Sequence, residues 1–244
     1  MKKLINQLLQ ITYVRILVGK LRLLYFTKIL KSLKTVDSKD AINMTLKHNL
    51  KGLSKFGLTR MNKLIKPLSV LENLSSDSKV LVIGPRNEED ILNLIGNGFK
   101  KKNIIGLDLI SYSPMIKIGD MHNTEFDDNT FDAIVCGWTL SYSNQPKKFA
   151  EEMVRIIKDK GVIAIGVEYS TLSLEDDLKV HKGYTLTTDG FDRINSVPAI
   201  LNLFDNKVGE VYFNHDAPNK ISHTDIIVKN VSSVVTIFSV NKSY

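Results

Sequence analysis

The feature of this sequence that most constrains its fold is an alternation of short β-branched runs with amphipathic segments after residue 78. Runs such as KVLVI at 79–83 and FDAIVCG at 131–137 have the length and composition of buried strands. The segments between them carry apolar residues at helical spacing, as in PKKFAEEMVRIIK at 146–158. This alternation predicts an α/β fold, a doubly wound and mostly parallel sheet with helices on both faces.

The predicted elements continue in this way to the end of the sequence. The last two predicted strands have no clear helix between them, although a parallel crossover needs about a dozen residues, usually helical. The sequence therefore predicts a seven-stranded sheet whose last strand is antiparallel. We expect strands at 79–83, 103–107, 115–118, 131–137, 161–168, 207–213 and 233–240, and helices at 89–96, 146–158 and 191–204.

The N-terminal part of the chain has a different pattern. Residues 4–33 carry apolar residues three and four positions apart, which predicts helix, and Gly19 divides it into two predicted helices. Helical signals continue over 37–74, where Pro67 predicts a kink. A polar run at 75–78 then precedes the first strand. We therefore expect two units, a basic helical extension at 1–76 and an α/β domain at 77–244.

The positive charge of the chain is concentrated at its N-terminal end. The formal net charge is +7, and residues 1–36 contain eight Lys and Arg but no Asp or Glu. Lys20 and Arg22 interrupt the apolar run, so we expect neither a bilayer-spanning helix nor a secretory signal. Three interpretations of residues 1–35 stay open: a helical extension packed on the domain, an amphipathic helix on an anionic membrane surface, or, with least support, a nucleic-acid contact.

The single cysteine limits both the compartment and the chemistry. One Cys excludes an intramolecular disulfide and fits a reducing compartment, so we expect a cytoplasmic protein, peripheral to a membrane if residues 1–35 bind lipid. Cys136 lies inside the apolar run at 131–137, where a small buried hydrophobe is a better interpretation than a nucleophile. No metal site is predicted, because no zinc spacing is matched by His215, Asp216, His223 and Asp225.

Four blocks between Val80 and Glu168 carry a family resemblance. They are VLVIGPRNEED, IIGLDL, GDMHNTEFDDNTFDAIVCGW and FAEEMVRIIKDKGVIAIGVE. Over about ninety residues their order and spacing resemble the motifs of class I S-adenosylmethionine-dependent methyltransferases of the small-molecule type. The third block is the most specific of the four. The resemblance implies a Rossmann-like methyltransferase fold and S-adenosylmethionine as the cofactor.

The resemblance also implies where the cofactor binds. Doubly wound sheets bind ligands at the carboxyl ends of their strands, and an acid there accepts the ribose hydroxyls. Asp108 ends the second strand, 24 positions after Gly84, and matches that acid. By resemblance, Asp120 lies beside the adenine and Met121 contacts its ring. The other predicted cofactor contacts are Gly84, Pro85, Arg86, Glu88, Leu109, His122, Gly137 and Trp138, the last of which is equally well explained as a core aromatic.

The first block departs from the family pattern. That pattern is glycine-rich and often has an acid where this chain has Val82, whereas only Gly84 remains of the glycines. The G-x-G-x-x-G pattern of a dinucleotide site is absent as well. S-adenosylmethionine carries an ammonium instead of a pyrophosphate, so the acids at 88–90 are compatible with it, although they also suit a helix N-terminus. Glu88 and a strand-end carbonyl near Gly84 are our hypotheses for binding the ammonium.

The sequence therefore indicates a methyltransferase that acts on an unidentified small-molecule, lipid or sugar acceptor. The sulfonium is already activated, so the protein mainly aligns donor and acceptor, and a base is needed only for a weakly acidic acceptor. The predicted candidates for such a base are His122 and Tyr142, with Glu168 and His181 behind them. The alternative function is a catalytically silent methyltransferase-like module that binds a partner. No nucleic-acid partner is expected, because the core has no basic stripe with stacking aromatics.

Overall fold

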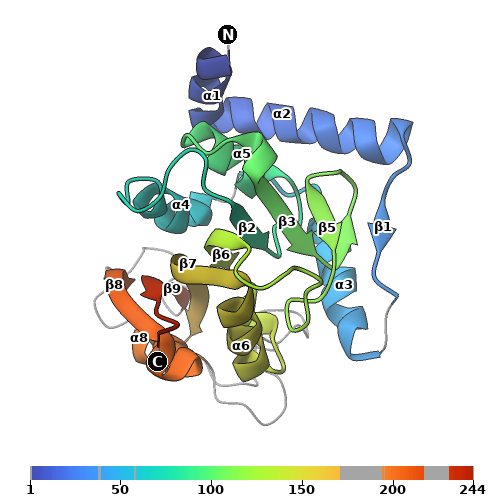
Figure 1. Cartoon of the computed structure of the whole chain (residues 1–244). Helices are drawn as coiled ribbons and strands as arrows, with labels where there is room; N and C mark the ends of the chain where they lie inside the picture. The colour runs from blue at the N-terminus through green and yellow to red at the C-terminus, as the bar shows by residue number, and fades with distance from the viewer. Residues whose placement is uncertain are drawn as a thin grey trace.

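The computed structural model describes residues 2–37, 40–57, 59–170, 194, 196–216 and 231–243. Within these residues one sheet runs through the molecule, and helices cover both of its faces (Figure 1). The start of the helix expected at 191–204 lies outside the described residues, as do the side chains of His181, His223 and Asp225.

The sheet confirms the predicted fold class. Its seven strands lie in the order β5-β3-β2-β6-β7-β9-β8. The pairs β2–β3, β2–β6, β3–β5 and β6–β7 are parallel, whereas β9 is antiparallel to both β7 and β8. The antiparallel strand is thus the last one in the sequence, as predicted, but it lies inside the sheet. The strands are β2 (Val80–Ile83), β3 (Ile104–Asp108), β5 (Ile116–Ile118), β6 (Phe131–Gly137), β7 (Ile157–Ser170), β8 (Val208–His215) and β9 (Val231–Val240).

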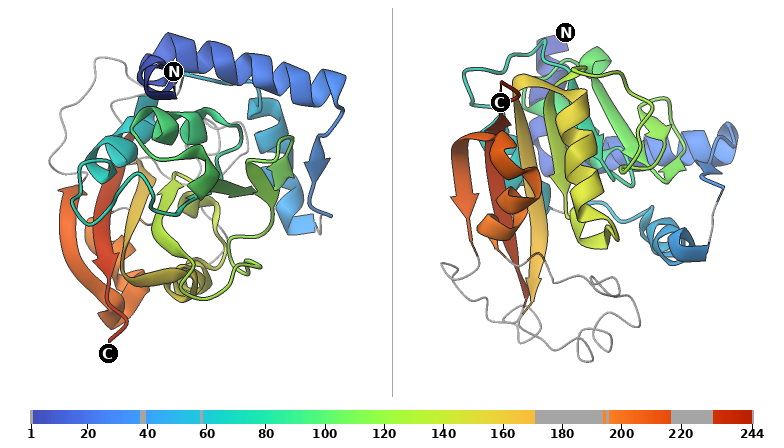
Figure 2. Two further views of the ribbon diagram at one scale, coloured as in Figure 1. Left: turned by 45° about the horizontal axis from the view of Figure 1, so that its top comes forward. Right: turned by 60° about the horizontal axis from the view of Figure 1, so that its bottom comes forward.

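Alternate residues of the strands pack into two separate hydrophobic cores. In β2, Val80 and Val82 belong to one core, while Leu81 and Ile83 belong to the other, as the two-residue period of a strand requires. The turned views in Figure 2 show α6 (Pro146–Ile156) and α8 (Val197–Leu201) on one face of the sheet. The opposite face is covered by α4 (Asn62–Leu68) and α5 (Glu89–Gly96).

Several short elements complete the α/β domain. The chain continues from α8 into the 3-10 helix η5 (Asn202–Lys207), and two further 3-10 turns are η3 (Lys101–Asn103) and η4 (Leu140–Tyr142). β7 begins at Ile157, inside the segment predicted as helix, because Ile157 pairs with Phe131 of β6 instead of continuing α6. The end of the predicted helix at 146–158 is therefore wrong by two residues.

The N-terminal helices lie across one end of the molecule. They are α1 (Lys2–Gln10) and α2 (Thr12–Leu24), and α2 runs on into a π-helical turn, η1 (Tyr25–Ile29). Both lie beside α5 in Figure 1. The predicted division at Gly19 is wrong, because the break falls at Ile11. Gly19 instead lies inside α2, where a Cβ would come within 2.5 Å of the Phe56 ring.

The chain then runs along one side of the domain before it enters the sheet. β1 (Lys34–Thr35) pairs antiparallel with β4 (Ile110–Ser111) in a small separate sheet. The following elements are α3 (Asp40–Gly52), the 3-10 turn η2 (Thr59–Met61) and α4. Pro67 lies one residue before the end of α4, so it marks a helix end and no kink. None of the helices within the described ranges is long and apolar enough to cross a membrane.

Candidate functional site

The predicted site residues lie at one edge of the sheet. The parallel strands β2, β3, β5 and β6 are neighbours, so their carboxyl ends meet at this edge. Each of these ends is followed by a loop that carries predicted cofactor contacts. The loops contain, in turn, residues 84–88, residues 108–109, residues 120–122 and residues 137–138.

The loop after β2 makes a sharp turn with a single glycine. Gly84 has a φ of +64°, and the side chain of Thr139 fills the space that a Cβ would need. Arg86 has a φ of +54°, a conformation that glycine adopts more easily. Pro85 is buried against Gly106 of β3. The glycine-poor loop therefore still turns sharply, although a side chain occupies a position that favours glycine.

Asp108 connects this loop to the next strand. Its side chain is 4% exposed, and its Oδ2 accepts a hydrogen bond from the Arg86 backbone N–H at 2.7 Å. Oδ1 accepts hydrogen bonds from the Ile110 N–H at 3.2 Å and from the Asn49 side-chain amide at 3.5 Å. Burial raises the pKa of Asp108 to about 6, although these hydrogen bonds oppose the shift.

Helix α3 covers the same loops, which the sequence did not predict. Asn49 contacts Asp108, and the Arg86 guanidinium lies against Gly52, where a Cβ would be 2.5 Å from Nη1. The His48 ring lies 6.3 Å from the Tyr142 ring. The Arg86 Nε is buried and has no hydrogen-bond partner among the described residues. The hydrogen-bonding capacity of this donor is therefore unused within the described residues.

Two of the acids at 88–90 bind groups of the N-terminal region. The fully buried carboxylate of Glu88 accepts hydrogen bonds from Arg22 Nε at 2.5 Å and from Arg22 Nη2 at 2.8 Å. Glu89 accepts a hydrogen bond from the Gly57 N–H at 2.7 Å. Asp90 is half-buried and has no hydrogen bond to its carboxylate within the described chain. Burial and the neighbouring Glu89 raise the pKa of Asp90 to about 7.

Asp120 and His122 form a hydrogen-bonded pair after β5. His122 Nδ1 lies 2.6 Å from Asp120 Oδ1, which also accepts the His122 backbone N–H at 2.9 Å. His122 Nε2 lies 2.7 Å from Ser143 Oγ. The hydrogen bond from His122 lowers the pKa of Asp120. Met121 packs against the core of the α6 face.

Trp138 follows β6 in a strained conformation. It is buried and has a φ of +63°, which is rare for a bulky residue. Its backbone N–H donates to the Gly166 carbonyl at 2.6 Å, and the Arg60 guanidinium lies 4.7 Å from its ring centroid. Arg60 also binds Glu168 at 2.9 Å. The Trp138 ring therefore packs within the core, and the Arg60–Glu168 pair lies over it.

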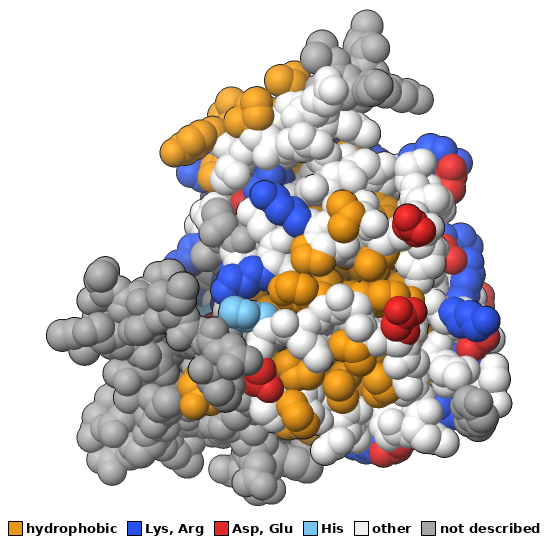
Figure 3. Space-filling model, turned by 90° about the vertical axis from the view of Figure 1, so that its left-hand side faces the viewer, with side chains coloured by type: hydrophobic (Ala, Val, Ile, Leu, Met, Phe, Trp, Pro, Cys, Tyr) orange, Lys and Arg blue, Asp and Glu red, His pale blue; other side chains and the backbone are white. Residues whose placement is uncertain are grey.

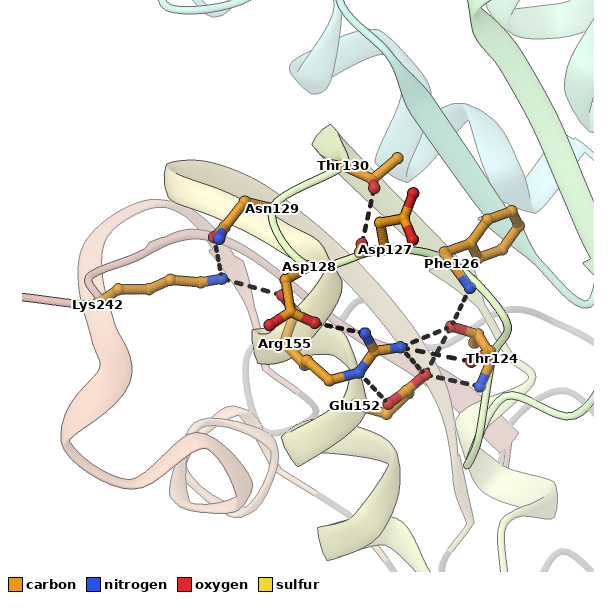
Figure 4. Close-up of polar contacts among 9 residues, drawn as sticks. All are labelled: Thr124, Phe126, Asp127, Asp128, Asn129, Thr130, Glu152, Arg155 and Lys242. Carbon is orange, nitrogen blue, oxygen red and sulfur yellow. Dashed lines mark hydrogen bonds and ion pairs between the residues drawn. The ribbon is translucent and has the colours of Figure 1, made fainter.

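Hydrogen bonds and ion pairs from Glu152 and Arg155 of α6 hold the loop that precedes β6 (Figure 4). Glu152 Oε1 accepts hydrogen bonds from the Thr124 N–H and hydroxyl, each at 2.6 Å. Arg155 binds Glu152 at 2.8 Å and Asp128 at 2.6 Å. Burial alone would raise the pKa of Glu152. The hydrogen bonds from Arg155 and Thr124 outweigh burial and lower this pKa. Asp128 therefore has a structural role, since it ties the loop before β6 to the last turn of α6.

Among the described residues, neither the thiol of Cys136 nor a cluster of carboxylates forms a second reactive site. Cys136 is fully buried, and burial raises the pKa of its thiol to about 12, which confirms the interpretation as a small hydrophobe. In the part of the chain that the structure describes, no group of three or more His, Cys, Asp or Glu side chains could hold a metal ion.

Comparisons with known proteins agree with this architecture. A mostly parallel sheet with one antiparallel strand and predicted cofactor contacts at its carboxyl edge defines a Rossmann-like methyltransferase fold. Residues 97–165 match the family model described as a methyltransferase domain. A search of curated proteins found no match.

Two solved structures share the fold at low sequence identity. A candidate sarcosine dimethylglycine methyltransferase from Galdieria sulphuraria is 14% identical with a TM-score of 0.56, and the alignment covers 82% of this chain and 98% of that one. Phosphoethanolamine N-methyltransferase 2 from Haemonchus contortus is 14% identical with a TM-score of 0.57, over 83% of this chain and 60% of that one. The domain match and the shared fold agree with the expected class I S-adenosylmethionine-dependent methyltransferase family.

Proposed function

We propose that the protein transfers a methyl group from S-adenosylmethionine to a small-molecule acceptor. The observation that carries this proposal is the carboxyl edge of the sheet. There a buried acid, a sharp loop with an unpaired arginine donor and an acid–histidine pair follow adjacent strands. The family match at 97–165 and the shared fold support the class of reaction.

The side chains at this edge fit the chemical groups of the cofactor. Asp108 is the acceptor for the ribose hydroxyls, and Asp120 and Met121 are the contacts for the adenine. The buried Arg86 Nε lacks an acceptor in the described structure and is the proposed partner of the cofactor carboxylate. Leu109, His122, Gly137 and Trp138 remain predicted contacts, as does Pro85 in the first loop. The bound cofactor supplies an activated methyl group on a sulfonium.

The cofactor ammonium needs an acceptor that is free to receive it. Glu88 remains a predicted contact, but both of its carboxylate oxygens already bind Arg22, so an ammonium would compete with the guanidinium. Asp90 has no hydrogen bond to its carboxylate within the described residues, and its pKa is raised to about 7. A cation beside Asp90 would favour its charged form. We therefore assign the ammonium to Asp90 together with a carbonyl near Gly84.

His122 is the proposed base for an acceptor that must lose a proton. His122 Nδ1 is hydrogen-bonded to Asp120, so Nε2 is the ring nitrogen that can accept a proton. In the structure, Ser143 Oγ lies 2.7 Å from Nε2. An acceptor hydroxyl or ammonium would take the place of the Ser143 hydroxyl. Tyr142 lies on η4 beside the His48 ring and is the second candidate.

The acceptor class and the location belong to the same proposal. We propose a metabolite as the acceptor, with a lipid or sugar intermediate as a narrower possibility, and a cytoplasmic location. The solved Haemonchus structure holds phosphomonomethylethanolamine and S-adenosylhomocysteine, which supports a small polar acceptor for this fold. The alternative of a catalytically silent binding module gains no support from the fold or the family match, and neither feature favours a nucleic-acid acceptor.

Calorimetric titration with S-adenosylmethionine tests the cofactor assignment. We expect saturable binding by the folded wild-type protein and none of comparable strength with a nicotinamide dinucleotide, whose pyrophosphate would meet the acids at 88–90. Arg86→Gln is expected to weaken binding by about tenfold, because a charged hydrogen bond is lost. Lys102→Gln is a matched control, since Lys102 is exposed and outside the site. A folded protein that binds no cofactor at millimolar concentration would contradict the proposal.

Methyl transfer itself is tested with methyl-labelled cofactor. The protein is incubated with pooled aqueous extracts and, separately, with lipid extracts, and the label is followed by chromatography. Label in an aqueous small molecule supports the proposal, whereas label confined to added nucleic acid would overturn the acceptor class. His122→Ala should reduce the rate by about a hundredfold, the usual contribution of a general base, and should weaken cofactor binding by a smaller factor, because His122 is also a predicted cofactor contact.

A further inference from the structure

Helix α2 has two faces of opposite character. Its inner face packs on the domain through Arg15 and Gly19, both buried, and through Val18 and Leu23. Its outer face is apolar but exposed: the side chains of Tyr13, Leu17, Leu21 and Leu24 are 84%, 58%, 57% and 56% exposed. A helix that only covers the domain needs a polar outer face. We call these four residues the α2 stripe.

The α2 stripe follows one line along the helix. Successive spacings of four, four and three residues place these side chains within about one third of the helix circumference. The apolar exposure continues past the end of α2 at Tyr25, Ile29 and Leu30. On the face drawn in Figure 3, hydrophobic side chains lie exposed at the top of the molecule, where the N-terminal helices lie. A continuous apolar surface of this kind marks an interaction site more often than scattered exposed residues do.

The charged residues of α2 are sorted between its two faces. Arg15 and Arg22 point inward, where Arg22 binds Glu88 and Arg15 donates to the Leu9 carbonyl at 3.0 Å. Lys20 is exposed and lies between Leu17 and Leu21 in the sequence, and the exposed Lys28 follows Leu24 by four residues, in η1. Exposed lysines continue after the helix at Lys31 and Lys34. The outer side is therefore apolar and cationic, with no acid among residues 1–36.

We propose that the α2 stripe docks on an anionic lipid bilayer. Leucines can enter the boundary between headgroups and acyl chains, while lysines reach anionic headgroups through their flexible stems. Tyr13 and Tyr25 have the amphipathic rings that are enriched at membrane interfaces. The helix lies flat and does not cross the bilayer, in keeping with its thirteen residues and its interrupting charges.

The charge pattern favours a bilayer over a second copy of the chain. Two stripes packed together would bring Lys20 and Lys28 of both copies close to one another, and no acid among residues 1–36 could pair with them. An anionic bilayer supplies the missing negative charge, and its mobile headgroups can pair with lysines at any position on the helix. Because the inner face of the same helix holds Glu88 through Arg22, docking would also place the cofactor loop close to the membrane.

Sedimentation of the full chain with vesicles tests the proposal. We expect binding to vesicles of equimolar phosphatidylcholine and phosphatidylserine, weaker binding to phosphatidylcholine alone, and loss of binding at high salt. Leu17→Gln/Leu21→Gln/Leu24→Gln should weaken partitioning by more than about tenfold, since apolar burial is lost. Lys20→Gln/Lys28→Gln should weaken it by about twentyfold, because each lysine near an anionic surface contributes about fivefold.

Matched variants elsewhere on the surface control for charge and hydrophobicity. Val70→Gln/Val211→Gln removes exposed apolar side chains, and Lys66→Gln/Lys102→Gln removes two exposed positive charges. Both control variants should bind vesicles within about twofold of wild type, because neither pair lies on α2. The substituted side chains all point to solvent, and circular dichroism with thermal unfolding verifies that each variant is folded.

Three results would overturn the proposal. The first is equal binding with and without phosphatidylserine, and the second is wild-type binding by the stripe variants. The third is a dimer by sedimentation velocity that the leucine variant converts to monomer without any vesicle binding, which would assign the stripe to a second copy. Cofactor titration of the same variants should be unchanged, so failure of docking is distinguishable from failure of the proposed methyl transfer.

Discussion

Asp108 and Asp120 follow the neighbouring strands β3 and β5 at one edge of the sheet, yet their carboxylates lie in opposite environments. Asp108 is 4% exposed, lies under α3, and has its pKa raised to about 6 by burial. Asp120 has a side chain that is 46% exposed, and the hydrogen bond from His122 lowers its pKa. One acid is thus enclosed by backbone donors, and the other is open and paired with a base.

The difference comes from the N-terminal helices. The region around Asp108 is closed by Asn49 of α3, while Arg22 of α2 holds the adjacent loop through Glu88. The loop that follows Asp120 is held instead by Thr124, which donates to Glu152 of α6, and by Asp128, which binds Arg155 of α6; the Asp120 carboxylate stays partly exposed. The sheet therefore sets where the acids lie, whereas burial under α3 for Asp108 and the hydrogen bond from His122 for Asp120 set how each of them ionises. This contrast suits a fixed ribose contact on one side and proton transfer on the other.

The largest expected effect tests whether α2 supports the enclosed region. Arg22→Gln leaves the fully buried Glu88 carboxylate without its partner and should lower the free energy of unfolding by about 3 kcal/mol. In a chain of this length that corresponds to a fall in Tm of about 10 °C. Lys147→Gln breaks an exposed pair with Asp205 and should cost less than about 1 kcal/mol. Urea unfolding measures both losses of unfolding free energy. Equal losses in the two variants would contradict a stabilising role of α2 at the enclosed region.

The pH dependence of stability should distinguish the two acids. The pKa of Asp108 is raised in the folded state, so its stabilising contribution is complete below its ordinary pKa and is lost as pH rises through about 6. The stability of wild type relative to Asp108→Asn should therefore fall by about 2 kcal/mol between about pH 4 and about pH 7. For Asp120, with its lowered pKa, the corresponding difference should stay constant over that range and fall only below about pH 4. Urea midpoints at several pH values measure both curves, and parallel curves would contradict the assignment.

Substitution of the two acids should also change cofactor affinity to different extents, although this difference is smaller than the difference in stability. Asp108→Asn removes a charged acceptor from the proposed ribose contact and should weaken S-adenosylmethionine binding by about tenfold to thirtyfold. Asp120→Asn keeps one acceptor oxygen for the adenine, so a loss of about threefold to fivefold is expected. Asp77→Asn, an exposed acid paired with Lys100, serves as the control. A reversed order of the two effects in calorimetry would exchange the proposed roles.

The smallest effect concerns the acid–histidine pair alone. His122→Ala removes the hydrogen bond that lowers the pKa of Asp120, so this pKa should rise toward its ordinary value. Carbon-detected NMR of the Asp120 carboxylate measures the change. Ser143→Ala, which removes the contact at His122 Nε2 only, should leave the pKa of Asp120 nearly unchanged. An unchanged pKa of Asp120 in His122→Ala would contradict control by this hydrogen bond.

The sequence predicts the strands of this protein better than the contacts between its distant parts. Hydrophobic runs identified β2 and β6 to within one residue, and the missing helix before β9 predicted its antiparallel direction. Because strand ends of a parallel sheet share one edge, the positions of Asp108 and Asp120 followed from the same pattern. Periodic patterns predict single strands and helices, and the order of parallel strands is enough to predict which residues lie at their carboxyl ends.

The contacts made by α2 and α3 could not be predicted in the same way. The Arg22–Glu88 pair joins residues 66 positions apart, and Asn49 reaches Asp108 across 59 positions. No local signal specifies which distant charge an arginine binds. The predicted break at Gly19 failed for a related reason, because that glycine serves close packing against Phe56 and does not interrupt the helix. The domain boundary at residue 76 stays a prediction.

The position of β9 has a consequence for how the chain is completed. β9 is made after β8 but lies between β7 and β8, and it supplies the hydrogen-bonding partner of both. Until β9 has left the ribosome, the inner edge of β7 carries unpaired backbone groups beside buried side chains, and such edges recruit other strands. A nascent chain that stalls within the β8–β9 connection would therefore expose an aggregation-prone edge of β7. Such a chain would need a chaperone to cover that edge until β9 is synthesised.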